Sequence, residues 1–202
     1  IVGWFLEHCV PLLKVSIVPR GSEALGYAQY LPREQYLYTT QQMLDNMCMT
    51  LGGRVAEQIK FGEISTGAQD DLQKITRQVY AQITRYGMCP ALGNVAYADV
   101  DESSGNYPKP YSEKTAKLID SEARRMVSEA YQRTEALLKS KMAQLELVAQ
   151  RLLEKEVLKT EDLVEILGER PFGMTRTSYE TLADKLIEEA EAKVRKHTDR
   201  KD

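Results

Sequence analysis

The four-residue spacing of apolar side chains constrains this chain more than any other feature of its sequence. After Thr39 the spaced residues are Met43, Met47, Leu51, Val55 and Ile59. This spacing places them on one face of an α-helix, and Thr39 with Gln42 three residues later forms a capping-box pattern at its start. Gly52-Gly53 lies inside the predicted helix and costs about 1 kcal/mol per glycine relative to alanine. We therefore expect a close backbone contact at that point.

The same spacing recurs further along the chain. Leu72, Ile75, Val79 and Ile83 predict a second helix, which stops at Gly87 and Pro90. Thr160 is expected to cap a short helix that runs to Leu167. Two longer helices are predicted between them, at 112–138 and 141–153. Several amphipathic helices joined by short connections favour an antiparallel helical bundle.

Little β-structure is expected. Residues 1–9 are predicted to be the end of an apolar helix, closed before Pro11. Segments 12–18 and 25–31 are short, partly alternating runs that favour a small hairpin or edge sheet near the N-terminus. Glycine, serine and proline make 93–110 a loop, with one possible strand at 94–98. The predicted fold class is therefore mainly α, with a small hairpin or edge sheet.

Composition limits the classes of function. The chain has 202 residues, 43% of them hydrophobic, with 27 basic and 30 acidic side chains and a net charge of -3. This balance lacks the basic surface that neutralises phosphates, so no nucleic-acid partner is expected. The three cysteines show no CxxC spacing, which favours a reducing compartment. No apolar run approaches the roughly 20 residues of a membrane-spanning helix, so any membrane contact is expected through segments outside this chain.

Few side chains stand out as chemical groups. His8 and His197 are too far apart in sequence to form a local zinc pair, and we interpret them as a residue near a helix end and a solvated residue of the tail. Asp70 and Asp71 fall at a predicted helix start. Aspartate is common there because it accepts hydrogen bonds from free N–H groups and complements the helix dipole. The residues alone therefore favour a capping role.

Four blocks of sequence carry a resemblance to a known family. They are LKVSIVPRG, ALGYAQYLP, LGGRVAE and STGAQDDL, at 13–21, 24–32, 51–57 and 65–72. In order and spacing they resemble the zinc peptidase domain of the FtsH-family AAA proteases. Their residues are most similar to those of the mitochondrial m-AAA branch with its paraplegin-like subunits. Shorter matches at 109–112, 152–156 and 167–172 extend the resemblance. It implies a metallopeptidase domain over 1–173 that lacks the start of its first helix. After it, the high charge and few apolar positions of residues 174–202 predict a helical extension.

The resemblance also implies roles for particular residues. In the family an HExxH turn runs directly into a sequence like the one that begins at Ile1, so the catalytic glutamate and two histidine ligands would lie before Ile1. Zinc would then take Asp71 as its third protein ligand. Thr66, Gly67 and Asp70 would either cap the helix or support that ligand. The fragment itself is expected to be inactive.

A substrate-binding strand is the second role that the resemblance implies. Leu25, Gly26, Tyr27 and Ala28 would lie beside the active cleft, where an unfolded polypeptide could pair with them through main-chain hydrogen bonds. The alternative is an ordinary hairpin strand with one buried face. The residues themselves do not decide between the two.

The function implied is that of an ATP-dependent, membrane-anchored zinc metalloprotease that degrades unfolded or misassembled membrane and matrix proteins. Zn²⁺ would be bound here, and ATP with Mg²⁺ by an AAA module outside the chain. The resemblance further implies a homo- or hetero-hexamer of related subunits at the mitochondrial inner membrane, facing the matrix. The main alternative is a proteolytically inactive subunit that acts in ring assembly, and a weaker one is a stand-alone helical adaptor. An intact HExxH upstream would favour the enzyme.

Overall fold

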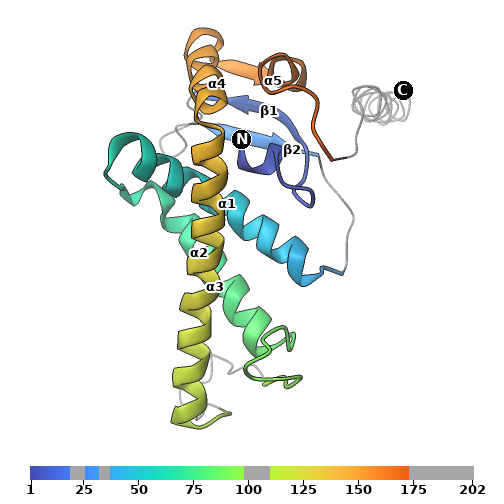
Figure 1. The fold of residues 1–202 in the computed structure, drawn as a ribbon, viewed down its shortest axis with the longest axis vertical. Helices are drawn as coiled ribbons and strands as arrows, with labels where there is room; N and C mark the ends of the chain where they lie inside the picture. Colours follow the sequence, from blue (N-terminus) through green and yellow to red (C-terminus); the bar gives the residue numbers. More distant parts are fainter. Residues whose placement is uncertain (19–25, 32–36, 98–109, 173–202) are drawn as a thin grey trace, which may run out of the picture.

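The computed structural model describes residues 1–18, 26–31, 37–97 and 110–172. Predictions for Leu25, for His197 and for the extension 174–202 fall outside these residues. Figure 1 shows a mainly helical fold with a small sheet at one end. The predicted fold class is confirmed.

The five helices lie close to their predicted positions. They are α1 Thr40–Phe61, α2 Gln69–Thr84, α3 Glu113–Ser140, α4 Met142–Lys155 and α5 Thr160–Leu167. The capping box before α1 is confirmed, because the Gln42 amide donates to Thr39 Oγ1 (3.3 Å) and the Thr39 amide donates to Gln42 Oε1 (2.8 Å). Ser112 caps α3 by accepting from the Thr115 amide at 3.3 Å. These local bonds explain why sequence spacing alone located the helix starts.

The bundle differs from the prediction in one respect. Helix α3 packs along both α1 and α2, but α4 continues the column of α3 instead of folding back beside it (Figure 1). Lys141 alone separates the two helices, serving as the C-cap of α3 and the N-cap of α4. One residue is too short to reverse the chain, since antiparallel helix pairs need connections of about 2–5 residues.

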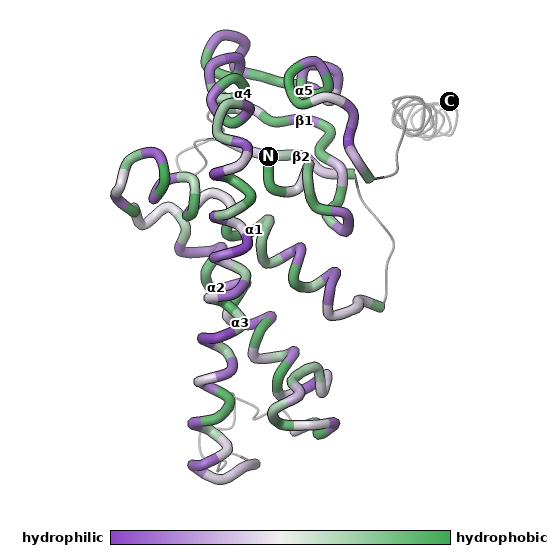
Figure 2. The backbone as a smooth tube through the Cα atoms, viewed as in Figure 1, coloured by the Kyte–Doolittle hydropathy of each residue, from purple (hydrophilic) through white to green (hydrophobic). Residues whose placement is uncertain are grey.

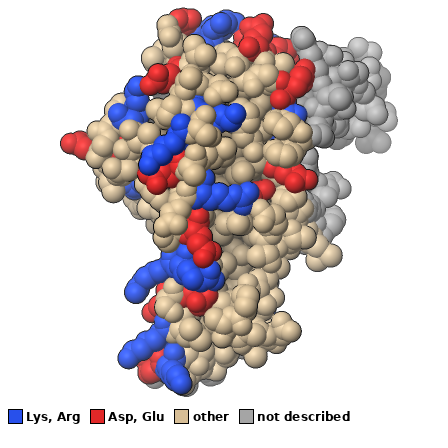
Figure 3. Space-filling model, in the orientation of Figure 1, with Lys and Arg blue, Asp and Glu red and all other residues tan. Residues whose placement is uncertain are grey.

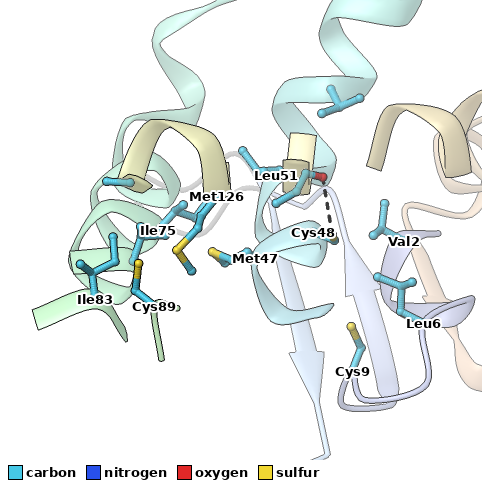
Figure 4. Close-up of a cluster of buried hydrophobic side chains, with 14 of the residues drawn as sticks. Val2, Leu6, Cys9, Met47, Cys48, Leu51, Ile75, Ile83, Cys89 and Met126 are labelled. Carbon is cyan, nitrogen blue, oxygen red and sulfur yellow. Dashed lines mark hydrogen bonds between the residues drawn. The ribbon is translucent and has the colours of Figure 1, made fainter. Parts of the chain in front are cut away.

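The main core lies between α1, α2 and α3. In Figure 4 the side chains of Met47, Ile75 and Met126 come together from these three helices. The three cysteines are all free and buried, as expected of core-filling residues. Burial raises the pKa of the Cys9 thiol to about 12, so this side chain stays protonated at neutral pH.

Glycine in α1 allows a close approach. A side chain at Gly52 would lie 3.2 Å from Cγ2 of Val2, whereas one at Gly53 would meet nothing within 4 Å. The predicted close contact is thus present at Gly52, and the partner is a side chain from the N-terminal segment.

The sheet holds the predicted hairpin and one further strand. Strand β1, Leu12–Ser16, pairs antiparallel with β2, Tyr27–Tyr30, which confirms the hairpin. On its other side β1 pairs antiparallel with β3, Val157–Lys159, giving the order β2-β1-β3. Trp4, Leu158 and Leu163 form a second small core beneath this sheet.

Thr160 does not have its predicted capping role. It is the first residue of α5, and its hydroxyl donates to the carbonyls of Leu12 (3.1 Å) and Leu13 (3.2 Å) in β1. The helix start is stabilised by Asp162 instead, whose carboxylate accepts from the Lys159 amide at 3.0 Å. A partner distant in sequence has taken the hydroxyl that would otherwise cap the helix.

The helix end predicted over 1–9 is reduced to a single 3₁₀ turn, η1, at Val2–Trp4. Beyond it the carbonyls of Leu6, Glu7 and Cys9 do not enter a helical ladder. They accept from Nη2 of Arg170 at 2.8, 3.2 and 2.7 Å. This buried guanidinium satisfies the backbone and lets the chain leave the helical path.

The predicted strand at 94–98 is absent from residues 94–97, the part of it that the structure describes. Residues 94–97 form no strand, and the Tyr97 amide donates to the carbonyl of Thr84 at 2.7 Å. Tyr97 also packs edge-on against Tyr111, with ring centroids 5.0 Å apart. The segment follows the end of α2 because its backbone bonds there.

Polar and apolar residues alternate around the helices. Figure 2 shows both kinds along α3, and Figure 3 shows side chains of both charges intermixed along the column of α3 and α4. Arg125 illustrates this mixture by pairing with Glu122 at 2.7 Å and Glu129 at 2.6 Å. Among the described helices, none is both long and apolar enough to cross a membrane.

Candidate metal site at the start of helix α2

A sharp turn between α1 and α2 brings the candidate residues into place. Helix α1 ends at Phe61, and Gly62 follows with φ 71°, the left-handed conformation that glycine adopts without strain. The Gly62 amide donates to the carbonyl of Gln58 at 3.1 Å, and the Gln58 side chain returns a bond to the carbonyl of Gly62 at 3.3 Å. The chain therefore leaves α1 in a defined direction.

A short 3₁₀ helix, η2, comes next at Thr66–Ala68. Ser65 caps it, because Ser65 Oγ accepts from the Gly67 amide at 3.2 Å. The same hydroxyl donates to Oε1 of Glu57 in α1 at 2.6 Å. Thr66 and Gly67 are exposed, and Ala68 is buried beneath them. The candidate residues 66 and 67 thus belong to a turn that leads directly into α2.

Asp70 and Asp71 occupy the second and third positions of α2. The N-cap is Ala68, which has no side chain that could cap. Asp70 is exposed, while 44% of the Asp71 side chain is exposed and one of its oxygens lies 3.3 Å from Nζ of Lys74. The free N–H groups of the helix start favour negative charge here. Asp71 thus presents an accessible carboxylate at a rigid helix end.

Asp71 suits zinc as one ligand of a set. A carboxylate oxygen is an ordinary zinc donor, and a complete site needs about four donors. Within the described ranges no group of three or more His, Cys, Asp and Glu side chains could hold a metal ion. His8, the described histidine, lies in the turn after η1, where its backbone amide donates to Asp45 at 3.3 Å. The described residues therefore supply one donor and not a whole site.

The candidate substrate strand is an edge of the sheet. Strand β2 pairs with β1 on one side and has no other strand partner among the described residues. Ala28, Gln29 and Tyr30 are exposed, and Tyr27 is half-buried. Gly26 precedes the strand, and a side chain there would come within 2.7 Å of the Ser16 carbonyl oxygen. Only glycine permits that backbone approach.

Tyr30, the last residue of β2, keeps 39% of its surface exposed. Burial of the remainder raises the pKa of Tyr30, and the charge of Asp71 acts in the same direction. Beside the strand lies an apolar cavity of about 320 Å³, whose lining includes Trp4, Ala28 and Tyr30.

The segment that holds these features matches a known family. The family model of peptidase family M41 matches residues 1–166, which include β2, η2 and the start of α2. This chain belongs to peptidase family M41. The match covers most of the predicted peptidase domain 1–173, whose exact boundary stays a prediction.

Individual M41 relatives agree. The chain is 56% identical over 184 residues to a mouse protein named mitochondrial inner membrane m-AAA protease component AFG3L1, covering 91% of this chain and 23% of that protein. It is 56% identical over 179 residues to the ATP-dependent zinc metalloprotease FtsH of Rhodothermus marinus, covering 86% and 25%. The m-AAA protease component yta12 of Schizosaccharomyces pombe is 51% identical over 176 residues, covering 86% and 22%. The resemblance to FtsH-family and m-AAA proteases is confirmed.

The chain spans about a quarter of the length of these relatives.

Two features of the M41 domain were not predicted from its sequence. One is β3, and the other is the contact of Glu57 with Ser65. Ser65 before Thr66-Gly67 is the kind of short polar residue that caps a helix start, and this was the available signal.

Proposed function

We propose that this M41 domain is the peptidase part of an ATP-dependent zinc metalloprotease, with Asp71 as a zinc ligand and β2 as a substrate-binding strand. The observation that carries the proposal is the family match across residues 1–166, which coincides with an accessible carboxylate at the start of α2. The name of the Rhodothermus marinus relative, an ATP-dependent zinc metalloprotease, supports the choice of metal.

Asp71 is suited to the ligand role by its position. A carboxylate fixed to the first turn of a helix moves little, so it can offer an oxygen at a constant place. Lys74 is its sole ion-pair partner within the described residues, and that contact is long and solvent-exposed. Such a pair is weak and would yield to a cation of higher charge. Bound zinc would lower the pKa of its water to roughly 7 and polarise the scissile carbonyl.

Strand β2 would hold the substrate. Opposite β1 it has no strand partner among the described residues, and an extended polypeptide would pair there with its main-chain N–H and C=O groups. Three of its four side chains are exposed. Main-chain hydrogen bonds depend little on the side chains of the substrate, so such binding has low sequence selectivity. This would suit unfolded or misassembled membrane and matrix proteins as substrates.

The other parts of the longer protein, and its assembly, are proposed from the names of the relatives. An AAA module that uses ATP and Mg²⁺, a membrane anchor and a homo- or hetero-hexameric ring would lie in the longer protein. The mouse and yeast relatives are named as components of a mitochondrial inner membrane m-AAA protease, which supports related subunits as partners and that membrane as the location. A matrix-facing orientation would place the domain among matrix substrates.

The test uses the full-length protein with Asp71→Asn, and Glu63→Gln at an exposed carboxylate of the preceding segment as the matched control. We expect the wild-type protein and the Glu63→Gln variant to hold zinc and to cleave an unfolded test protein in the presence of ATP. Asp71→Asn should lose cleavage and most of its zinc, because the amide is a poor zinc ligand. A wild-type protein that assembles with related subunits but neither holds zinc nor cleaves would favour the inactive assembly subunit.

A further inference from the structure

Helix α1 reaches across the turn to the segment that carries Asp71. Oε1 of Glu57 accepts from the Ser65 hydroxyl at 2.6 Å, and Oε2 lies 3.4 Å from the Ser65 amide. Both oxygens of one carboxylate therefore hold one residue. We propose that Glu57, acting through Ser65, is a positioning residue that fixes the Asp71 carboxylate where zinc requires it. This inference rests on the proposed function of Asp71.

The segment between the two helices has little else to hold it. Residues 62–67 are all exposed, so apolar packing contributes little to their position. Among the described residues, every side-chain hydrogen bond between α1 and residues 63–68 is donated by Ser65 to Glu57. In contrast, α1 is anchored in the core by Leu51 and Val55, which are 1% and 0% exposed. Glu57 thus ties a weakly packed segment to a rigid support.

The tie is transmitted to Asp71 by consecutive hydrogen bonds. Ser65 Oγ accepts from the Gly67 amide at 3.2 Å, which sets the start of η2. The carbonyl of Thr66 then accepts from the Gln69 amide, and Gln69 is the first residue of α2. Asp71 follows two residues later. If Ser65 shifted, η2 and the first turn of α2 would shift with it.

Zinc is sensitive to such a shift. A ligand must lie within about 0.2 Å of its ideal distance, and groups that orient a ligand commonly change metal affinity by 10- to 100-fold when removed. A purely structural hydrogen bond on the surface behaves differently, because its loss barely changes global stability. Metal affinity and thermal stability therefore separate the positioning role from a structural one.

The experiment measures zinc affinity in the full-length protein by competition with a chelator, together with the melting temperature. Glu57→Ala and Ser65→Ala should each weaken zinc binding by about tenfold or more. The double variant should be no weaker than either single one, because both remove the same contact. Glu57→Gln keeps one acceptor oxygen and should recover part of the affinity. The matched control is Glu63→Ala, which removes an exposed carboxylate from the same segment without touching Ser65.

Each outcome decides something different. Equal zinc affinity in Glu57→Ala and wild type, with zinc lost in Asp71→Asn, would overturn the positioning role and leave the proposed function standing. Full zinc binding by Asp71→Asn, or none by wild type, would overturn the ligand role and this inference with it. Additive losses in the double variant would show that Glu57 and Ser65 act separately. If Glu57→Ala lowers the melting temperature, its zinc affinity no longer separates the two roles. The zinc affinities of Ser65→Ala and Glu57→Gln then decide, by the same criteria.

Discussion

Helix α1 takes part in two regions that are held together by different forces. Along α3 it buries apolar side chains such as Met47 and Leu51, each 1% exposed. At its C-terminal end it meets residues 62–67, which are exposed and held by hydrogen bonds. Apolar burial supplies most folding free energy, whereas exposed hydrogen bonds supply little but fix direction. The fold and the candidate site should therefore respond to different substitutions.

The largest effect is expected in the buried region. Leu51→Ala would leave a cavity between α1 and α3 and should lower the free energy of unfolding by about 3 kcal/mol. Urea denaturation would measure this loss. Leu147→Ala is the matched control, because 55% of that leucine is exposed and its loss should cost below about 0.5 kcal/mol. Similar losses for both leucines would contradict the assignment of the core.

Arg170 gives the next largest effect and shows that hydrogen bonds can also be buried. The residue is 6% exposed, and its Nη2 donates to the carbonyls of Leu6, Glu7 and Cys9. Arg170→Ala would leave these acceptors without their donor, at a cost of about 2 kcal/mol. Arg151→Ala breaks only an exposed ion pair of 3.9 Å and should cost below about 0.5 kcal/mol. Equal unfolding curves for the two variants would show that the buried hydrogen bonds of Arg170 stabilise the fold no more than the exposed ion pair of Arg151.

A smaller effect, dependent on pH, is expected at the start of α5. The hydrogen bond from Lys155 at 2.6 Å, followed by that from the Lys159 amide, holds the pKa of Asp162 below its usual range. A lowered pKa stabilises the fold above the unfolded value, about 4, and this contribution is lost as pH falls through the folded value. Asp162→Asn should therefore cost about 1 kcal/mol at pH 7 and almost nothing near pH 2. A constant difference across this range would show that the charge is not responsible.

Sequence patterns predicted the parts of the fold that depend on near neighbours. Helix α1 could be placed because its capping box and apolar spacing are local. Strand β3 could not, because its three residues show no alternation and it pairs with β1, more than 140 positions earlier. Thr160 failed as a cap for a similar reason, since its hydroxyl binds carbonyls of β1. Distant partners leave no periodic signal in the sequence.

The candidate site divides in the same way. The position of Asp71 at a helix start followed from the residues around it, and its ligand role came from family resemblance. The contact of Glu57 with Ser65 joins two polar residues eight positions apart, across a turn whose shape depends on Gly62. Polar surface residues carry no apolar period, so only the structure could bring this pair together.

The smallest effect on stability is expected from Ser65→Ala, and it sharpens the comparison between the two regions. The variant removes the contact with Glu57 and the cap of η2, both exposed, so the free energy of unfolding should change by less than about 0.5 kcal/mol. Local opening should nevertheless increase, because the Gly67 amide loses its acceptor. Hydrogen exchange would show faster exchange at Gly67 and unchanged exchange at Leu51 in the core. Faster exchange at both amides would mean that the turn supports the whole fold and that the two regions are not independent.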